Sequence, residues 1–177
     1  TDALLEIAAV LVAPDSDHRW RIEQVLSKHI QPFAGANMDP AALEFNGIDP
    51  DHPFRKQIAE SEAQALGEIF KVIRKKIKQY HCRRAVLVGH NAAFDLAFLN
   101  AASARCNIKR NPFHPFSTFD TVSLAGLAYG QTVLSRAVQA AGINWDSKEA
   151  HSARYDAEKT AELFCKIVNE CRIRNSD

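Results

Sequence analysis

The stretch that most constrains the fold of this chain is Ala85–Asp95, AVLVGHNAAFD. Five apolar or glycine residues run into a histidine, a turn, and an aspartate beside a phenylalanine. A short apolar run that stops at turn residues predicts a buried strand over Ala85–Gly89, and the residues after the turn predict a helix over Asp95–Arg105. We therefore expect the strand to be followed by a loop that contains His90, and the Asp95 carboxylate to lie at the start of the next helix.

A second polar string, HSARYD, occupies His151–Asp156 and opens an amphipathic helix predicted over Ala153–Arg172. Separated carboxylates with a titratable imidazole are what metal-assisted hydrolysis requires. The alternative is that each aspartate only caps its helix. The presence of both strings, each at the start of a helix, favours a site built from Asp95, Asp156 and His151.

The rest of the chain alternates between strand and helix patterns. Strands are predicted over Glu6–Val12 and Ser117–Asp120, and Arg21–Ile30 is ambiguous by period, with a strand favoured because a proline follows. The clearest helix is Ser61–Tyr80, with apolar residues at the i, i+3, i+4, i+7 spacing. Shorter helices are predicted over 39–45 and 132–141, and loops over 49–53 and 111–116. The 177 residues are expected to form a single mixed α/β domain.

Charge and composition limit the kinds of molecule that this protein is expected to bind. The net charge is only +1, but seven Lys or Arg residues and no acid lie between Lys71 and Arg84. A basic run is often a solvated helix face; beside a carboxylate site it favours contacts with phosphates. No apolar run approaches the roughly 18 residues of a membrane span, so we expect a soluble, cytoplasmic protein without membrane contact. The four cysteines are far apart, which argues against a zinc site and a disulfide framework.

The strings HNAAFD and HSARYD resemble the second and third motifs of the DEDD exonucleases, in the subclass whose general base is a histidine. The resemblance implies a ribonuclease H-like fold, with a mixed central sheet flanked by helices. It also implies two Mg²⁺ ions per active site, for which Mn²⁺ can substitute, with Asp95 and Asp156 as metal ligands and His151 as the base. The family takes two further carboxylates from a D-x-E motif on its first strand. This sequence has no such motif at a strand, and Glu6 is a poor substitute, so we expect that strand and both carboxylates upstream of Thr1.

The blocks PFAGANMDPAALEFNGIDP and KRNPFHPFSTFDT resemble one branch of that family, bacterial 3′ exoribonucleases that trim transfer RNA and other stable RNAs. This resemblance implies hydrolysis from the 3′ end to nucleoside 5′-monophosphates by a homodimer. Phe45, Phe94 and Phe116 match phenylalanines that stack on the terminal bases, although core packing is the alternative for each. The residues that match those holding the body of the RNA are Lys78, Arg84 and Lys109. Asp120 matches an aspartate outside the metal set and is interpreted as structural. Ala41 stands where the branch has a base-contacting glutamate, which leaves the preference among 3′-terminal bases open.

Two other functions remain compatible with the sequence. A proofreading-type 3′-5′ DNA exonuclease shares both motifs but does not need the lysine-rich helix or the KRNPFHPF block, and single-stranded DNA could be a second substrate. A catalytically dead RNA-binding module of the same fold is supported only by the missing D-x-E motif. The residues encoded before Thr1 would separate this module from an enzyme.

Overall fold

The computed structural model describes residues 2–174, and the side chains through Cys171. The strands are β1 (Glu6–Pro14), β2 (Trp20–His29), β3 (Ala85–Gly89) and β4 (Phe113–Asp120). The helices are α1 (Pro40–Asn46), α2 (Pro53–Ile58), α3 (Glu62–Gln79), α4 (Ala92–Arg105), α5 (Thr121–Tyr129), α6 (Leu134–Ala140) and α7 (Ala153–Arg174).

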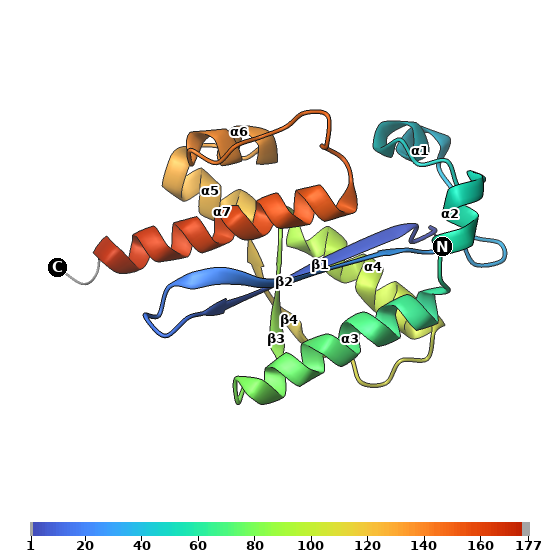
Figure 1. The fold of residues 1–177 in the computed structure, drawn as a ribbon, viewed down its shortest axis with the longest axis horizontal. Helices are drawn as coiled ribbons and strands as arrows, with labels where there is room; N and C mark the ends of the chain where they lie inside the picture. The colour runs from blue at the N-terminus through green and yellow to red at the C-terminus, as the bar shows by residue number, and fades with distance from the viewer. Residues whose placement is uncertain (1, 175–177) are drawn as a thin grey trace.

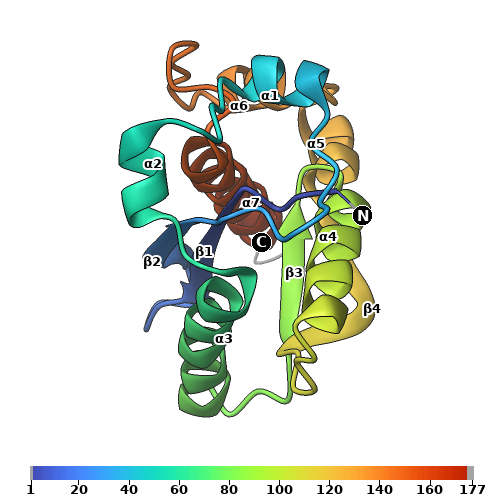
Figure 2. The ribbon, with the colours of Figure 1, turned by 90° about the vertical axis from the view of Figure 1, so that its right-hand side faces the viewer.

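The strands form two pairs of opposite kind: β1 and β2 are antiparallel, and β3 and β4 are parallel. Figure 1 shows α7 and α3 on opposite sides of the β1–β2 hairpin. Figure 2, which looks along the molecule, places β3 beside the hairpin and α4 on the far side of β3. The ambiguous segment 21–30 is thus a strand. The turn at Asp15 connects β1 to this strand and so sets their antiparallel pairing. The Asp15 carboxylate accepts hydrogen bonds from the backbone N–H groups of Asp17 and Arg19, which stabilises the turn.

One apolar cluster joins α3, β3 and α4. The predicted spacing of α3 places its apolar stripe inward, and the capping box of Ser61 and Gln64 fixes where that helix starts. The buried members of the cluster are Leu66, Ile69, Phe70, Ile73, Leu87, Ala92, Leu99 and Ala102. This cluster holds β3, and with it the loop after β3, rigidly in place.

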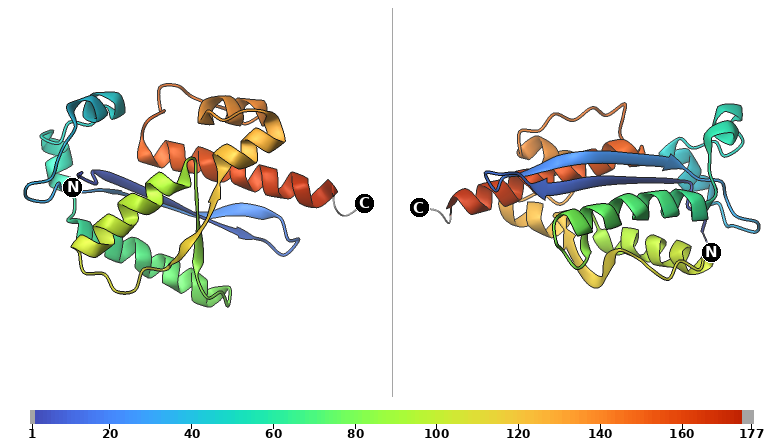
Figure 3. Two further views of the ribbon diagram at one scale, coloured as in Figure 1. Left: turned by 180° about the vertical axis from the view of Figure 1, so that it is seen from behind. Right: turned by 60° about the horizontal axis from the view of Figure 1, so that its bottom comes forward.

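A second apolar cluster joins α5, α6 and α7, which stack on one another in Figure 3. Its buried residues include Val138 of α6 together with Leu163 and Ile167 of α7. The middle of α7 is thereby held against α5 and α6. No helix within residues 2–174 is long and apolar enough to cross a membrane.

Three local predictions need correction. Helix α4 begins at Ala92, three residues before the predicted start. Helix α2 begins at Pro53, the last residue of the predicted loop, where proline is favoured in the first turn of a helix, and continues through residues for which no structure was predicted. Residues 113–116, predicted as loop, belong to β4. The register explains the error: Ala85 pairs with Phe113 but Leu87 pairs with Thr118, so residues 114–117 bulge out opposite one residue of β3 and the proline is tolerated.

Candidate active site

The loop between β3 and α4 positions Asp95. Asn91 adopts the left-handed conformation, with φ of 73°, which asparagine tolerates better than most residues. The carboxylate of Asp120, at the end of β4, accepts hydrogen bonds from the backbone N–H groups of Asn91 and Ala92, both at 3.1 Å. It also accepts one from Val122 at 2.9 Å, at the start of α5. Asp120 is therefore structural, and it fixes the turn from which α4 and Asp95 project.

Gly89 allows the Asp95 carboxylate to lie against the end of β3. A Cβ atom at position 89 would lie 2.7 Å from Oδ2 of Asp95 and 2.9 Å from Cα of Ala92. Any side chain here would displace the carboxylate or the backbone of α4. The glycine that ends the predicted strand thus has a steric role in the site.

Desolvation raises the pKa of Asp95 to about 6, and the neighbouring Asp120 carboxylate adds to the rise. The backbone N–H of Asp95 itself opposes this shift. Part of the residue remains open to solvent, but its carboxylate is packed close to protein atoms at Gly89. A nearby cation would favour the charged form of such a carboxylate.

Asp156 lies in the first turn of α7, which starts after Ser152. The Ser152 hydroxyl accepts a hydrogen bond from the backbone N–H of Tyr155, and the backbone carbonyl of Ser152 accepts one from the N–H of Asp156. Burial raises the pKa of Asp156, whereas the backbone N–H of His151 and the imidazoles of His151 and His90 act in the opposite direction. The Oδ1 atom of Asp156 is buried and has no hydrogen-bond partner among the described residues. A buried carboxylate oxygen of this kind is suited to binding a cation.

His151 lies in the loop just before α7, outside the helix that was predicted to begin at Ala153. Its backbone is left-handed, with φ of 73°, and its side chain is exposed. The imidazole packs on the ring of Phe45, with 4.3 Å between ring centroids. Helix α1 is thus in contact with the loop that leads into α7, although the two contacting residues are far apart in the sequence.

The structure excludes core packing for the three phenylalanines singled out in the sequence. Phe45, Phe94 and Phe116 are 66%, 60% and 80% exposed, respectively. Phe45 lies against His151, and Phe94 is next to Asp95 and contacts Phe98 with 4.8 Å between centroids. Phe116 lies in the bulge of β4 and packs on His114 instead.

His90 is a site residue that the sequence reasoning did not assign. Its Nε2 atom is 2.9 Å from the carbonyl oxygen of Thr132, and its Nδ1 atom is 3.0 Å from the hydroxyl of Thr121. Because a carbonyl can only accept, Nε2 carries a proton. The buried Thr121 hydroxyl also contacts the carbonyl of Gly89 at 3.2 Å. His90 thereby connects the loop before Asp95 to residues at both ends of α5. The sequence feature that could have identified His90 is its position directly after the predicted strand.

The basic residues lie away from the carboxylates. Lys78, Arg84 and Lys109 are all exposed, and Arg84 donates a hydrogen bond to the carbonyl of Asn111 at 2.9 Å. Arg84 directly precedes β3 and Asp95 follows it, so the two lie beyond opposite ends of that strand, with the end of α3 on the side of Arg84 (Figure 1). The structure does not bring these cations into the carboxylate site.

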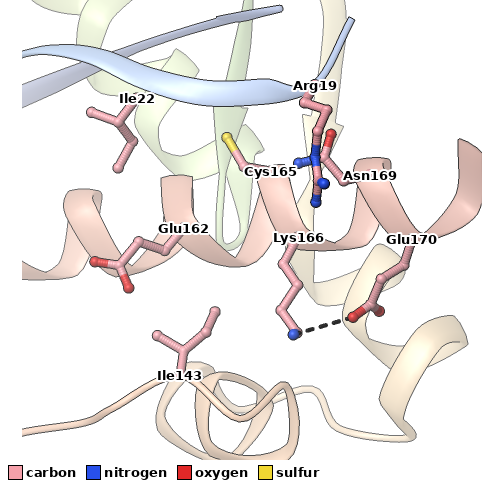
Figure 4. A pocket seen from close by; sticks show the side chains of 8 residues that line it. All are labelled: Arg19, Ile22, Ile143, Glu162, Cys165, Lys166, Asn169 and Glu170. Carbon is pink, nitrogen blue, oxygen red and sulfur yellow. Dashed lines mark ion pairs between the residues drawn. The ribbon is translucent and has the colours of Figure 1, made fainter. Parts of the chain in front are cut away.

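A pocket of about 450 Å³ lies elsewhere, between the β1–β2 hairpin and the middle of α7 (Figure 4). Its charged lining residues balance, with two cations and two acids, and Lys166 pairs with Glu170 at 3.2 Å. The pocket therefore offers no net attraction for phosphate. It is lined by Arg19, Ile22, Ile143, Glu162, Cys165, Lys166, Asn169 and Glu170.

Among residues 2–174, no group of three or more His, Cys, Asp and Glu side chains converges to hold a metal ion. Asp95 and Asp156 provide two hard oxygen donors in the first turns of α4 and α7, and one oxygen of Asp156 has no hydrogen-bond partner among the described residues. This donor set fits Mg²⁺ or Mn²⁺, but it is a partial one, because such ions need more ligands than two carboxylates supply.

The chain is similar to known proteins in sequence and in fold. The profile of RNase_T, described as an exonuclease family, matches residues 1–164. A curated relative, "Ribonuclease T" from Hahella chejuensis (strain KCTC 2396), is 62% identical over 169 residues, which cover 96% of this chain and 77% of the relative.

Among solved structures, the chain is similar to the nuclease domain of 3′hExo, a DEDDh family member, bound to rAMP, with a TM-score of 0.66 and 15% identity over 96% of this chain and 95% of that one. It is also similar to a 3′-exonuclease in a structure of 3′-end specific recognition of a histone mRNA stem-loop, with a TM-score of 0.62 and 14% identity over 96% of this chain. The match spans 65% of that second protein's length. These likenesses confirm the mixed α/β, ribonuclease H-like fold predicted from the sequence.

Proposed function

The chain belongs to the RNase_T exonuclease family, and we propose that it is a metal-dependent 3′-to-5′ exoribonuclease that trims transfer RNA and other stable RNAs. The products would be nucleoside 5′-monophosphates, and the proposed location is the cytoplasm, where these RNAs are processed. The observation that carries the site assignment is the buried, unpartnered Oδ1 of Asp156 beside the exposed imidazole of His151. The 62% identity to a ribonuclease T supports RNA over DNA as the main substrate.

Asp95 and Asp156 would hold the divalent ions, Mg²⁺ or Mn²⁺. When bound, two such ions stabilise the charge on the attacking and leaving oxygens of a phosphodiester. Two carboxylates are too few for this purpose, so the proposal includes two further carboxylate ligands besides Asp95 and Asp156. The raised pKa of both aspartates supports the assignment, because a carboxylate that is partly shielded from water regains its charged form next to a cation.

His151 acts as the general base and accepts a proton from the attacking water. Its exposed position in a loop, beside Asp156, leaves the imidazole free to reach a substrate. Phe45 and Phe94 flank this region and provide faces for the last bases of the RNA. Each stacking contact is worth about 1–3 kcal/mol and tolerates many base sequences. Phe116, on β4, would contact RNA farther from the carboxylates.

The site assignment is tested by Asp156→Asn in the full-length enzyme. A neutral amide is a poor ligand for a hard cation, so cleavage of a 3′-extended tRNA precursor should be abolished while the circular dichroism spectrum is retained. The matched control is Asp17→Asn, which neutralises an exposed carboxylate in the β1–β2 turn. Full activity in Asp156→Asn, or cleavage of a circular RNA, would contradict the proposal. Faster hydrolysis of single-stranded DNA than of RNA would indicate the proofreading type instead.

We further propose that the enzyme is a homodimer in which the basic surface of one subunit, Lys78, Arg84 and Lys109, binds RNA whose 3′ end enters the carboxylate site of the other. The support is positional, because these exposed cations and Asp95 lie beyond opposite ends of β3. Neutralising all three should weaken binding and flatten its salt dependence by nearly one unit of slope for each lost phosphate contact. Neutralising Arg19, Arg21 and Lys166 instead controls for the change in net charge.

The arrangement in trans is tested by mixing subunits. One carries Asp156→Asn, and the other carries the neutralised basic surface. Mixed dimers should recover part of the activity, because one of their two composite sites is intact. Mixed dimers without recovered activity, or a monomer at micromolar concentration, would exclude the arrangement.

A further inference from the structure

The loop that carries His151 is closed by a contact with the side chain of Tyr155. This residue lies in the first turn of α7, next to Asp156, and its hydroxyl accepts a hydrogen bond from the backbone N–H of Asp146 at 2.5 Å. Its ring packs edge-on against Trp145, with 5.2 Å between ring centroids. Residues 146–155 therefore form a closed loop whose two ends meet at one tyrosine (the connection from α6 to α7 in Figure 1).

Inside this loop the backbone is held by short-range hydrogen bonds. The carboxylate of Asp146 accepts from the N–H of Lys148 at 2.9 Å, and the N–H of Ser152 donates to the carbonyl of Glu149 at 3.4 Å. The chain then passes through His151 in a left-handed conformation, which is unfavourable for a residue with a side chain. Such a conformation persists only where the surroundings fix it, and the contacts of Tyr155 at both Trp145 and Asp146 fix the far end of the loop.

We propose that Tyr155 is a positioning residue for His151. Through the hydrogen bond to Asp146, it sets the loop on the same helical turn that carries Asp156, so that the imidazole and that carboxylate keep a fixed relation. The inference rests on the proposed role of His151 as general base. Tyr155 touches neither substrate nor metal in this role, and its effect on the reaction passes only through the loop.

The first test is Tyr155→Phe in the full-length enzyme, which keeps the ring against Trp145 and removes only the hydroxyl. We expect kcat to fall about threefold to tenfold, the range for loss of one neutral hydrogen bond, with KM for RNA unchanged. Amide hydrogen exchange at residues 146–152 should accelerate. The matched control is Tyr129→Phe, whose hydroxyl donates to Glu170 of α7 at 2.6 Å. Glu170 lies about 21 Å along the helix from Asp156, so kcat should stay at the wild-type value.

A double-mutant cycle separates positioning from a general structural effect. If Tyr155 acts only through His151, then Tyr155→Phe should not lower kcat further in a His151→Ala background. The same fold-loss in both backgrounds, or a wild-type kcat and exchange rate in Tyr155→Phe, would overturn the inference. Full activity of His151→Ala alone would instead refute the proposed base, and the exchange rates at residues 146–152 would still decide whether Tyr155 fixes the loop.

Discussion

Gly89→Ala tests the steric role of the glycine at the end of β3. The new methyl carbon would lie 2.7 Å from Oδ2 of Asp95 and 2.9 Å from Cα of Ala92, whereas ordinary contact begins at 3.4 Å. The carboxylate must therefore move by about 0.7 Å and the α4 backbone by about 0.5 Å, the differences between these distances. Overpacking of this kind costs about 1–3 kcal/mol. A misplacement near 1 Å at a catalytic group can lower the rate about 100-fold.

The measurements are urea denaturation of the purified protein and single-turnover cleavage of RNA by the full-length enzyme. The matched control is Gly67→Ala in α3, where an added Cβ meets no atom within 4 Å. That change should stabilise the helix by about 0.5–1 kcal/mol and leave activity unchanged. If Gly89→Ala is as stable and as active as Gly67→Ala, then Asp95 does not depend on the close approach at β3.

Three further changes follow from the same structure. His151→Ala should lower kcat by about 10²–10⁴-fold with metal affinity retained, whereas loss of Mn²⁺ binding with little change in kcat would assign it as a ligand. Asp95→Asn should raise the free energy of unfolding of the metal-free protein at pH 8, because the folded state disfavours the charged form of this carboxylate. The stabilisation should shrink as the pH falls through about 6, where Asp95 becomes protonated in the folded state. It should vanish below the ordinary pKa of aspartate, near 4, where the carboxyl is neutral in both states. An equal gain at pH 3.5 and pH 8 would contradict that explanation. Arg55→Met should destabilise the fold by about 3 kcal/mol, because the buried guanidinium donates hydrogen bonds to the carbonyls of Leu5 and Ile30 and forms an ion pair with Glu6. The control is Lys56→Met, which removes an exposed ion pair and should cost less than about 1 kcal/mol.

Parts of the fold and site that depend on local chemistry were predicted from the sequence. The apolar spacing placed α3 within one residue at each end. The helix predicted over Ala153–Arg172 left His151 in the loop and placed Asp156 in the helix, and the structure has this arrangement. The start of α4 was misplaced because it is set by Asp120, which lies 28 residues beyond Ala92.

The sequence by itself determined which chemical groups are present and where they lie along the chain: a strand followed by a histidine, two aspartates at the starts of helices, and a group of cations before β3. These features are local, because residue types, spacing and turn preferences act over a few positions of the chain. Tertiary structure alone decided that Phe45 packs on His151, that His90 reaches the carbonyl of Thr132, and that Asp156 keeps a buried oxygen without a partner. Burial and long-range hydrogen bonds depend on which distant segments meet, and no local pattern in the sequence specifies that meeting.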